Sequence, residues 1–76
     1  MTIKKMSLGD FFSYINLIQK PYPGHFRFGQ NAFTFLYGVR ADIAHELVAT
    51  EFDPFADDKN VPKFLSKLLS DFVEFQ

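Results

Sequence analysis

Apolar residues recur at helical spacing in four segments of this 76-residue chain. The first stripe consists of residues three or four positions apart, namely Leu8, Phe11, Phe12, Ile15 and Ile18. Ser7 precedes this stripe, and Asp10 follows three residues later as in a variant of the capping box. The pattern predicts a helix over residues 8–19 after an N-terminal arm of residues 1–6.

The second segment is apolar almost all round, which is typical of a central, buried helix. We expect this helix over residues 31–39, with Gln30 or Asn31 as its cap. Before it, residues 25–28 alternate as a short strand or an extended connector would. Because no convincing second strand is present in the sequence, we favour the connector.

Two further helices are predicted in the second half of the chain. Asp42 opens one over residues 42–50, and Pro62 suits the first turn of another over residues 62–75. The last helix has one continuous apolar stripe, made of Phe64, Leu65, Leu68, Leu69, Phe72 and Phe75. The pattern therefore predicts an all-α fold, a single small orthogonal bundle of about four helices in one domain.

The composition makes aromatic packing the main expected source of stability. The chain has eleven Phe and three Tyr but no cysteine, so an aromatic-rich core takes the place of disulfides. No apolar run approaches the roughly 20 residues that cross a bilayer. The first residues lack the uninterrupted apolar stretch of a signal peptide. We expect a soluble protein without a cofactor.

Charge is distributed unevenly along the chain although its net value is only −1. Residues 1–41 hold five Lys or Arg and one acid, and residues 42–76 hold eight acids and three Lys. Residues 42–58 contain six acids and no Lys or Arg. These candidate partner-binding residues are Asp42, Glu46, Glu51, Asp53, Asp57 and Asp58. Such a segment can bind a basic protein surface or imitate nucleic acid, or it can be a solvated face.

Two catalytic interpretations of the same segment are weaker. Carboxylates at 51, 53, 57 and 58 suggest a metal site, but the spacing lacks the glycine and alternate ligands of a calcium loop. Asp42 and His45 are three residues apart and can touch, as in half of a hydrolase triad, with Glu46 beside them. No serine stands in a nucleophile-elbow context, so we do not expect an enzyme.

A second candidate surface mixes basic and aromatic residues between positions 20 and 40, a combination that grips single-stranded nucleic acid. Its members are Lys20, Tyr22, Arg27, Phe28 and Arg40. Their low density and the isoelectric point near 6.0 make nucleic-acid binding the alternative rather than the leading hypothesis.

Three runs of sequence resemble a pattern in small uncharacterised proteins of bacteria, phages and mobile elements. They are RFGQ at 27–30, FLYGVRADIA at 35–44 and TEFDPFADD at 50–58, within a similarity over about residues 27–66. Those proteins often have proline where Ala41 stands here. The resemblance implies an intracellular bacterial or phage setting and names no active site.

The leading hypothesis is therefore a phage- or mobile-element-encoded protein in the cytoplasm of a bacterial host. It would bind a protein partner, as an adaptor or inhibitor of a host factor such as a defence protein, or bind a second copy of itself. Besides the acidic segment, Leu17 and Val73 support this hypothesis because both are apolar residues outside the predicted core stripes.

Overall fold

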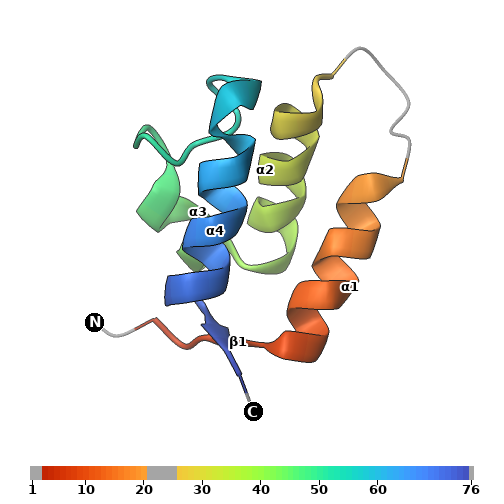
Figure 1. Ribbon diagram of the computed structural model, residues 1–76, viewed down its shortest axis with the longest axis vertical. Helices are drawn as coiled ribbons and strands as arrows, with labels where there is room; N and C mark the ends of the chain where they lie inside the picture. Colours follow the sequence, from red (N-terminus) through yellow and green to blue (C-terminus); the bar gives the residue numbers. More distant parts are fainter. Residues whose placement is uncertain (1–2, 21–25, 76) are drawn as a thin grey trace.

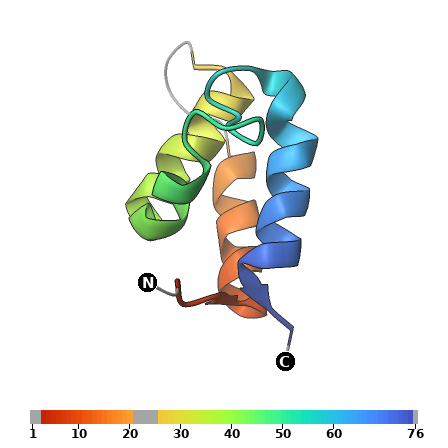
Figure 2. The same cartoon turned by 90° about the vertical axis from the view of Figure 1, so that its left-hand side faces the viewer.

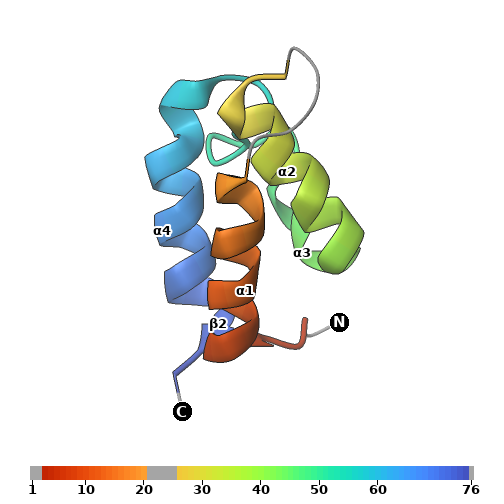
Figure 3. The ribbon, with the colours of Figure 1, turned by 90° about the vertical axis from the view of Figure 1, so that its right-hand side faces the viewer.

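The computed structural model describes residues 3–20 and 26–75. Its elements are β1 (Met6–Ser7), α1 (Leu8–Gln19), α2 (Phe28–Val39), α3 (Ala41–Leu47), the short 3-10 helix η1 (Asp58–Asn60), α4 (Val61–Asp71) and β2 (Val73–Glu74). In Figure 1, α1, α2 and α4 surround a common interior, and α3 turns back beside α2. In Figure 3, α1 lies in front, with α4 to its left and α2 to its right. The predicted all-α class is confirmed.

The core takes residues from all four α-helices and from both short strands. Its buried apolar members are Met6, Phe11, Tyr14, Ile18, Ala32, Phe33, Leu36, Ile43, Ala44, Leu47, Phe64, Leu68 and Val73. Phe33 and Phe64 meet edge to face at a centroid distance of 6.1 Å. The prediction of an aromatic core is confirmed, yet five Phe are exposed: Phe12, Phe26, Phe28, Phe55 and Phe75.

Helix α1 has the predicted bounds, 8–19. Ser7 is its N-cap, and the Ser7 hydroxyl accepts a hydrogen bond from the Asp10 backbone N–H at 3.0 Å. Ser7 directly precedes the helix and Asp10 lies in its first turn, so local pattern was sufficient to place this end.

Helix α2 begins at Phe28, so the predicted range 31–39 was wrong at its start. The Arg27 N–H donates to Gln30 Oε1 at 3.0 Å, and the Gly29 N–H donates to Asp58 Oδ1 at 3.0 Å. One free N–H of the first turn is therefore satisfied by a carboxylate 29 residues further along the chain. That distant cap allows the helix to begin earlier than the local sequence indicates.

Helix α3 spans 41–47 and not the predicted 42–50. Ala49 adopts a positive φ of 61°, a left-handed conformation that ends helices. The Asp53 carboxylate accepts a hydrogen bond from the Ala49 N–H at 2.8 Å and holds this conformation. Alanine rarely serves as such a stop, which is why the sequence pattern extended the helix too far.

Helix α4 ends at Asp71, so the predicted range 62–75 was wrong in its last residues. Val73 leaves the helix, is only 2% exposed, and pairs with Met6 in a parallel two-stranded sheet. Val73 is thus a core residue and not the off-stripe surface residue expected. Figure 2 shows the two short strands meeting at the end of the molecule where both termini lie.

The extended connector expected at 25–28 is only partly accounted for. His25 lies outside the described residues, Phe26 and Arg27 have no regular structure, and Phe28 already belongs to α2. The sequence pattern did not reveal the two short strands at 6–7 and 73–74, which pair with each other and not with residues 26–28.

Candidate functional site

Residues 27–29 and 53–58 meet in a clamp between the start of α2 and the loop before η1. Arg27 Nη1 donates to Asp58 Oδ1 at 2.8 Å, and Arg27 Nη2 donates to the Phe55 carbonyl at 2.7 Å. The Gly29 N–H uses the same Asp58 oxygen. Residues 27–29 and 53–58, which are far apart in sequence, are therefore spatial neighbours, and their polar groups stabilise each other.

Asp53 is the interior member of the acidic segment, with only 5% of its surface exposed. Its two carboxylate oxygens accept the backbone N–H groups of Ala49 at 2.8 Å and Phe55 at 2.9 Å. Asn60 Nδ2 also donates to the Asp53 carbonyl at 3.0 Å. Asp53 therefore orders the loop, and its carboxylate is not an exposed charge as the predicted partner-binding set assumed.

The other five acids of the set are exposed, but only two are without a hydrogen-bonded partner within the described chain. Asp58 binds Arg27, Asp42 binds Arg40, and Asp57 accepts the Lys59 N–H at the start of η1. Glu46 and Glu51 make no ion pair with a residue described in the structure. Fewer acids are therefore available to a partner than the sequence indicates, and within the described chain they are Glu46 and Glu51.

Among the described residues, the geometry supports neither the metal site nor the Asp42–His45 pair that the sequence suggested. No group of three His, Asp or Glu side chains within 3–20 and 26–75 is arranged to hold a metal ion. Asp42 is turned to Arg40, and the His45 ring packs edge to face on Tyr37 at a centroid distance of 5.2 Å. The Asp42–His45 contact that a triad would need does not form.

A groove runs between α2 and the loop that follows α3. It has a volume of about 230 Å³ and is lined by Phe33, Thr34, Tyr37, Val48, Asp53 and Phe55. Val48 and Phe55 are 41% and 44% exposed at its edge. Because Glu46 and Glu51 flank Val48 in sequence and are exposed, we call this feature the acid-flanked groove. It is mainly apolar inside, and the exposed Glu46 of α3 and Glu51 of the following turn lie two and three residues from Val48 in sequence.

The basic and aromatic residues proposed for nucleic acid do not form a free cationic surface. Arg27 and Arg40 are both paired with carboxylates at 2.8 Å. Lys20 stands at the end of α1, Phe28 is exposed at the start of α2, and Tyr22 lies outside the described residues. Because both arginines are paired, less positive charge is available to bind phosphate groups.

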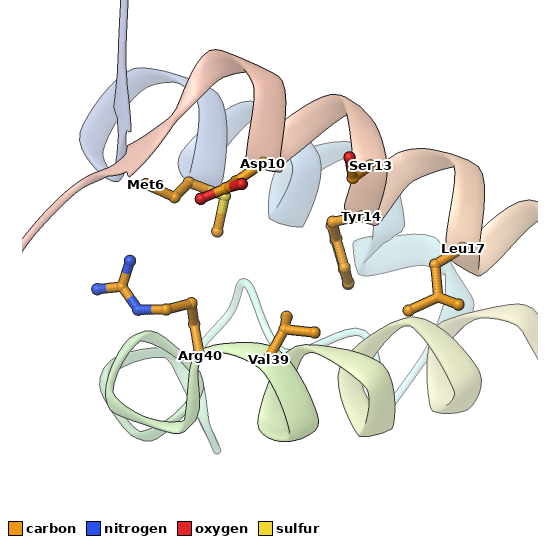
Figure 4. Close-up of a pocket in the computed structure, with 7 residues that line it drawn as sticks. All are labelled: Met6, Asp10, Ser13, Tyr14, Leu17, Val39 and Arg40. Atoms are coloured by element: carbon orange, nitrogen blue, oxygen red, sulfur yellow. The ribbon is translucent and has the colours of Figure 1, made fainter.

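A second cavity lies between α1 and the end of α2, and we call it the α1–α2 pocket. It has a volume of about 330 Å³ and is lined by Met6, Asp10, Ser13, Tyr14, Leu17, Val39 and Arg40. Figure 4 shows Asp10 across the pocket from Arg40, Tyr14 close to Val39, and Leu17 at the other end. Leu17, expected to point away from the core, faces this cavity.

Hydrogen bonding fixes the charged groups at one end of this pocket. Arg40 Nε and Nη2 donate to the two oxygens of Asp42 at 3.0 and 2.8 Å, and Nη2 also donates to the Lys4 carbonyl. This pair raises the pKa of the Arg40 guanidinium and lowers the pKa of the Asp42 carboxyl. Burial raises the pKa of the Tyr14 phenol, whose hydroxyl donates to the Ala32 carbonyl.

The Asp42 carboxyl should titrate below the ordinary value of about 3.9, and Arg40→Gln should move it upward. Since the folded pKa is depressed, the stabilisation is present above pH ~4 and is lost as the pH falls through the folded pKa. NMR titration of the carboxyl carbon measures this. Lys63→Gln, which removes an exposed charge from α4, is the control. Identical Asp42 titration in wild type and Arg40→Gln would contradict the assignment.

Comparisons with protein-family models, curated proteins and solved structures return no match to this chain. Among the described residues, no helix is both long and apolar enough to cross a membrane. The site must therefore be interpreted from its own geometry.

Sequence reasoning named Asp53, Arg40 and Leu17 but assigned no surface to the other residues that line the two cavities. Val48, Phe55 and Val39 are single apolar residues next to turns or helix ends, where periodicity does not assign a face. Asp10, Ser13, Tyr14 and Leu17 do share the spacing of one helix face, at positions three or four apart. That spacing is a local signal of the α1 face that lines the α1–α2 pocket.

Proposed function

We propose that this chain binds a protein partner, and does not catalyse a reaction, through the acid-flanked groove. The observation that carries the proposal is that Val48 and Phe55 are exposed around an apolar depression. Clustered apolar side chains at a depression are typical of binding surfaces, whereas isolated ones are common on any protein.

Burial of these side chains would supply binding energy. Complete burial of a Val or Phe side chain contributes roughly 1.5–3 kcal/mol, and each is already partly covered here. Phe33 and Tyr37 at the base of the groove come from α2 and are fixed by the core, so little side-chain entropy is lost there.

Charge indicates the chemistry of the partner. Residues 42–58 contain no Lys or Arg, and Glu46 and Glu51 are exposed without an ion pair in the described chain. Arg27, which lies close to Phe55, is neutralised by Asp58. The complementary surface presents an apolar side chain beside Lys or Arg, and opposite charge accelerates the encounter.

The resemblance to phage and mobile-element proteins gives this proposal a biological setting. In that setting the partner is a host factor in the bacterial cytoplasm, and the chain acts as an adaptor or inhibitor, with defence proteins among the candidates. Nucleic-acid binding is less well supported, because Arg27 and Arg40 already neutralise Asp58 and Asp42.

A comparison of two double variants tests the proposal. Val48→Ser with Phe55→Ser alters the groove, and Phe12→Ser with Phe75→Ser alters residues that are 57% and 59% exposed outside it. We expect the tagged wild-type chain and the Phe12/Phe75 variant to capture the same protein from bacterial lysate, and the Val48/Phe55 variant to lose it. Circular dichroism checks that both variants fold.

Equal capture by both variants would place binding outside the groove. Failure to capture any protein, with a monomeric mass in light scattering, would contradict partner binding. A dimeric mass that the Val48/Phe55 variant loses would identify the partner as a second copy. If capture depends on nucleic acid and disappears after nuclease treatment, the alternative function replaces the proposed one.

A further inference from the structure

The α1–α2 pocket has one charged end and one apolar end. Asp10 and Arg40 face each other across the charged end, and Tyr14, Leu17 and Val39 form the apolar part (Figure 4). The volume of about 330 Å³ is at the small end of the roughly 300–1,000 Å³ typical of ligand sites. A ligand of this cavity is therefore small and carries both polar and apolar groups.

The charged end offers binding groups of both signs. The Asp10 carboxylate makes no ion pair with any described residue, since its hydrogen bond to Ser7 uses only the backbone N–H. Arg40 is held in place by Asp42 and Lys4 through Nε and Nη2, so within the described chain Nη1 is still available as a donor. A fixed guanidinium with a free donor is suited to a carboxylate.

Both charges belong to the same pocket, yet they lie too far apart to form a salt bridge with each other. A simple carboxylate would meet the repulsion of Asp10, and a simple amine would leave the Arg40 Nη1 donor without an acceptor, because Arg40 is already paired with Asp42. A molecule that carries an ammonium and a carboxylate on one carbon satisfies both Asp10 and Arg40, and an apolar side chain on that carbon extends toward Leu17 and Val39.

We infer that the α1–α2 pocket binds a free α-amino acid with an apolar side chain. The Asp10 carboxylate accepts from the ligand ammonium, Arg40 Nη1 donates to the ligand carboxylate, and Tyr14, Leu17 and Val39 contact the side chain. This site is separate from the acid-flanked groove, which shares none of its lining residues.

Calorimetric titration with L-leucine, L-methionine and L-phenylalanine tests the inference. We expect one-to-one binding of at least one of the three. For the amino acid that binds, its amide lacks the carboxylate charge and its deaminated acid lacks the ammonium, while glycine lacks the side chain. The amide and the deaminated acid should each bind about tenfold more weakly or worse, because each loses a charge-assisted hydrogen bond. Glycine should also bind more weakly, because it cannot contact the apolar part of the pocket.

Substitutions complete the test. Asp10→Asn keeps the shape of the side chain and should weaken amino-acid binding about ten- to a hundredfold without changing the helical circular dichroism signal. Glu46→Gln, beside the acid-flanked groove, is the control and should leave the affinity unchanged. The inference is overturned if no apolar amino acid binds at millimolar concentration, if the analogues bind equally well, or if Asp10→Asn has no effect. The Val48/Phe55 variant should still bind the amino acid, so failure of the groove proposal is a separate result.

Discussion

Replacing Gly29 with alanine is expected to destabilise the fold by roughly 3 kcal/mol. A Cβ at this position would lie 2.3 Å from the Pro54 carbonyl oxygen and 2.6 Å from Asp58 Oδ1. The first contact is with backbone, which cannot rotate away, and the second displaces the carboxylate that caps α2 and binds Arg27. The substitution therefore forces apart the two sides of the clamp.

Urea unfolding followed by circular dichroism measures this effect, and Gly38→Ala is the matched control. Gly38 is also in α2, but a Cβ there meets nothing within 4 Å. Alanine at a helix interior is favoured over glycine by about 0.5–1 kcal/mol, so this control should stabilise the protein. Opposite signs for the two substitutions support the clamp, whereas a Gly29→Ala protein as stable as wild type would show that it does not form.

Asp53→Ala is expected to destabilise the protein by roughly 2–4 kcal/mol. The carboxylate accepts two backbone N–H groups in the loop, from Ala49 and Phe55, and its removal leaves both without their partners. Ala49 then holds its positive φ of 61° without that support. Loss of this acid should therefore loosen the whole turn that follows α3.

The matched control for this prediction is Asp57→Ala, which removes an exposed carboxylate that accepts one N–H, from Lys59. Loss of such a cap costs about 1 kcal/mol. Thermal unfolding of both variants compares a buried acid with an exposed one from the same segment. If Asp57→Ala destabilises the protein as much as Asp53→Ala, the interior role assigned to Asp53 is wrong.

Local sequence predicted an element well wherever its ends are fixed by neighbouring residues. Helix α1 is capped by Ser7, directly before it, and its predicted bounds are correct. Helix α2 is capped by Asp58, which lies 29 residues after Gly29 in the chain. A periodicity argument cannot include such partners, because it considers only the residues within a few turns of each position.

The end of α4 could not be predicted from local sequence either, because it depends on packing between residues far apart in the chain. Val73 continues the chain after a strongly amphipathic helix, and nothing near it in sequence indicates a strand. Its pairing with Met6 joins the two ends of the chain, so only the folded structure shows that Val73 is buried.

The candidate site was predictable in composition but not in detail. The excess of acids in residues 42–58 can be read from the sequence. Which acids are available depends on tertiary pairing, since Arg27 and Arg40 engage Asp58 and Asp42 while Asp53 lies inside. The apolar edge residues Val48 and Phe55 form a groove only because the turn after α3 brings them against α2.

Binding of a protein partner in the acid-flanked groove is tested most directly by NMR. The amide chemical shifts of the ¹⁵N-labelled chain are measured before and after the captured partner is added. We predict that the perturbed amides of the ¹⁵N-labelled chain cluster at Phe33, Thr34, Tyr37, Val48 and Phe55, which line the groove. Perturbations centred instead on α1 and α4, with the amides of these five residues unchanged, would contradict the claim.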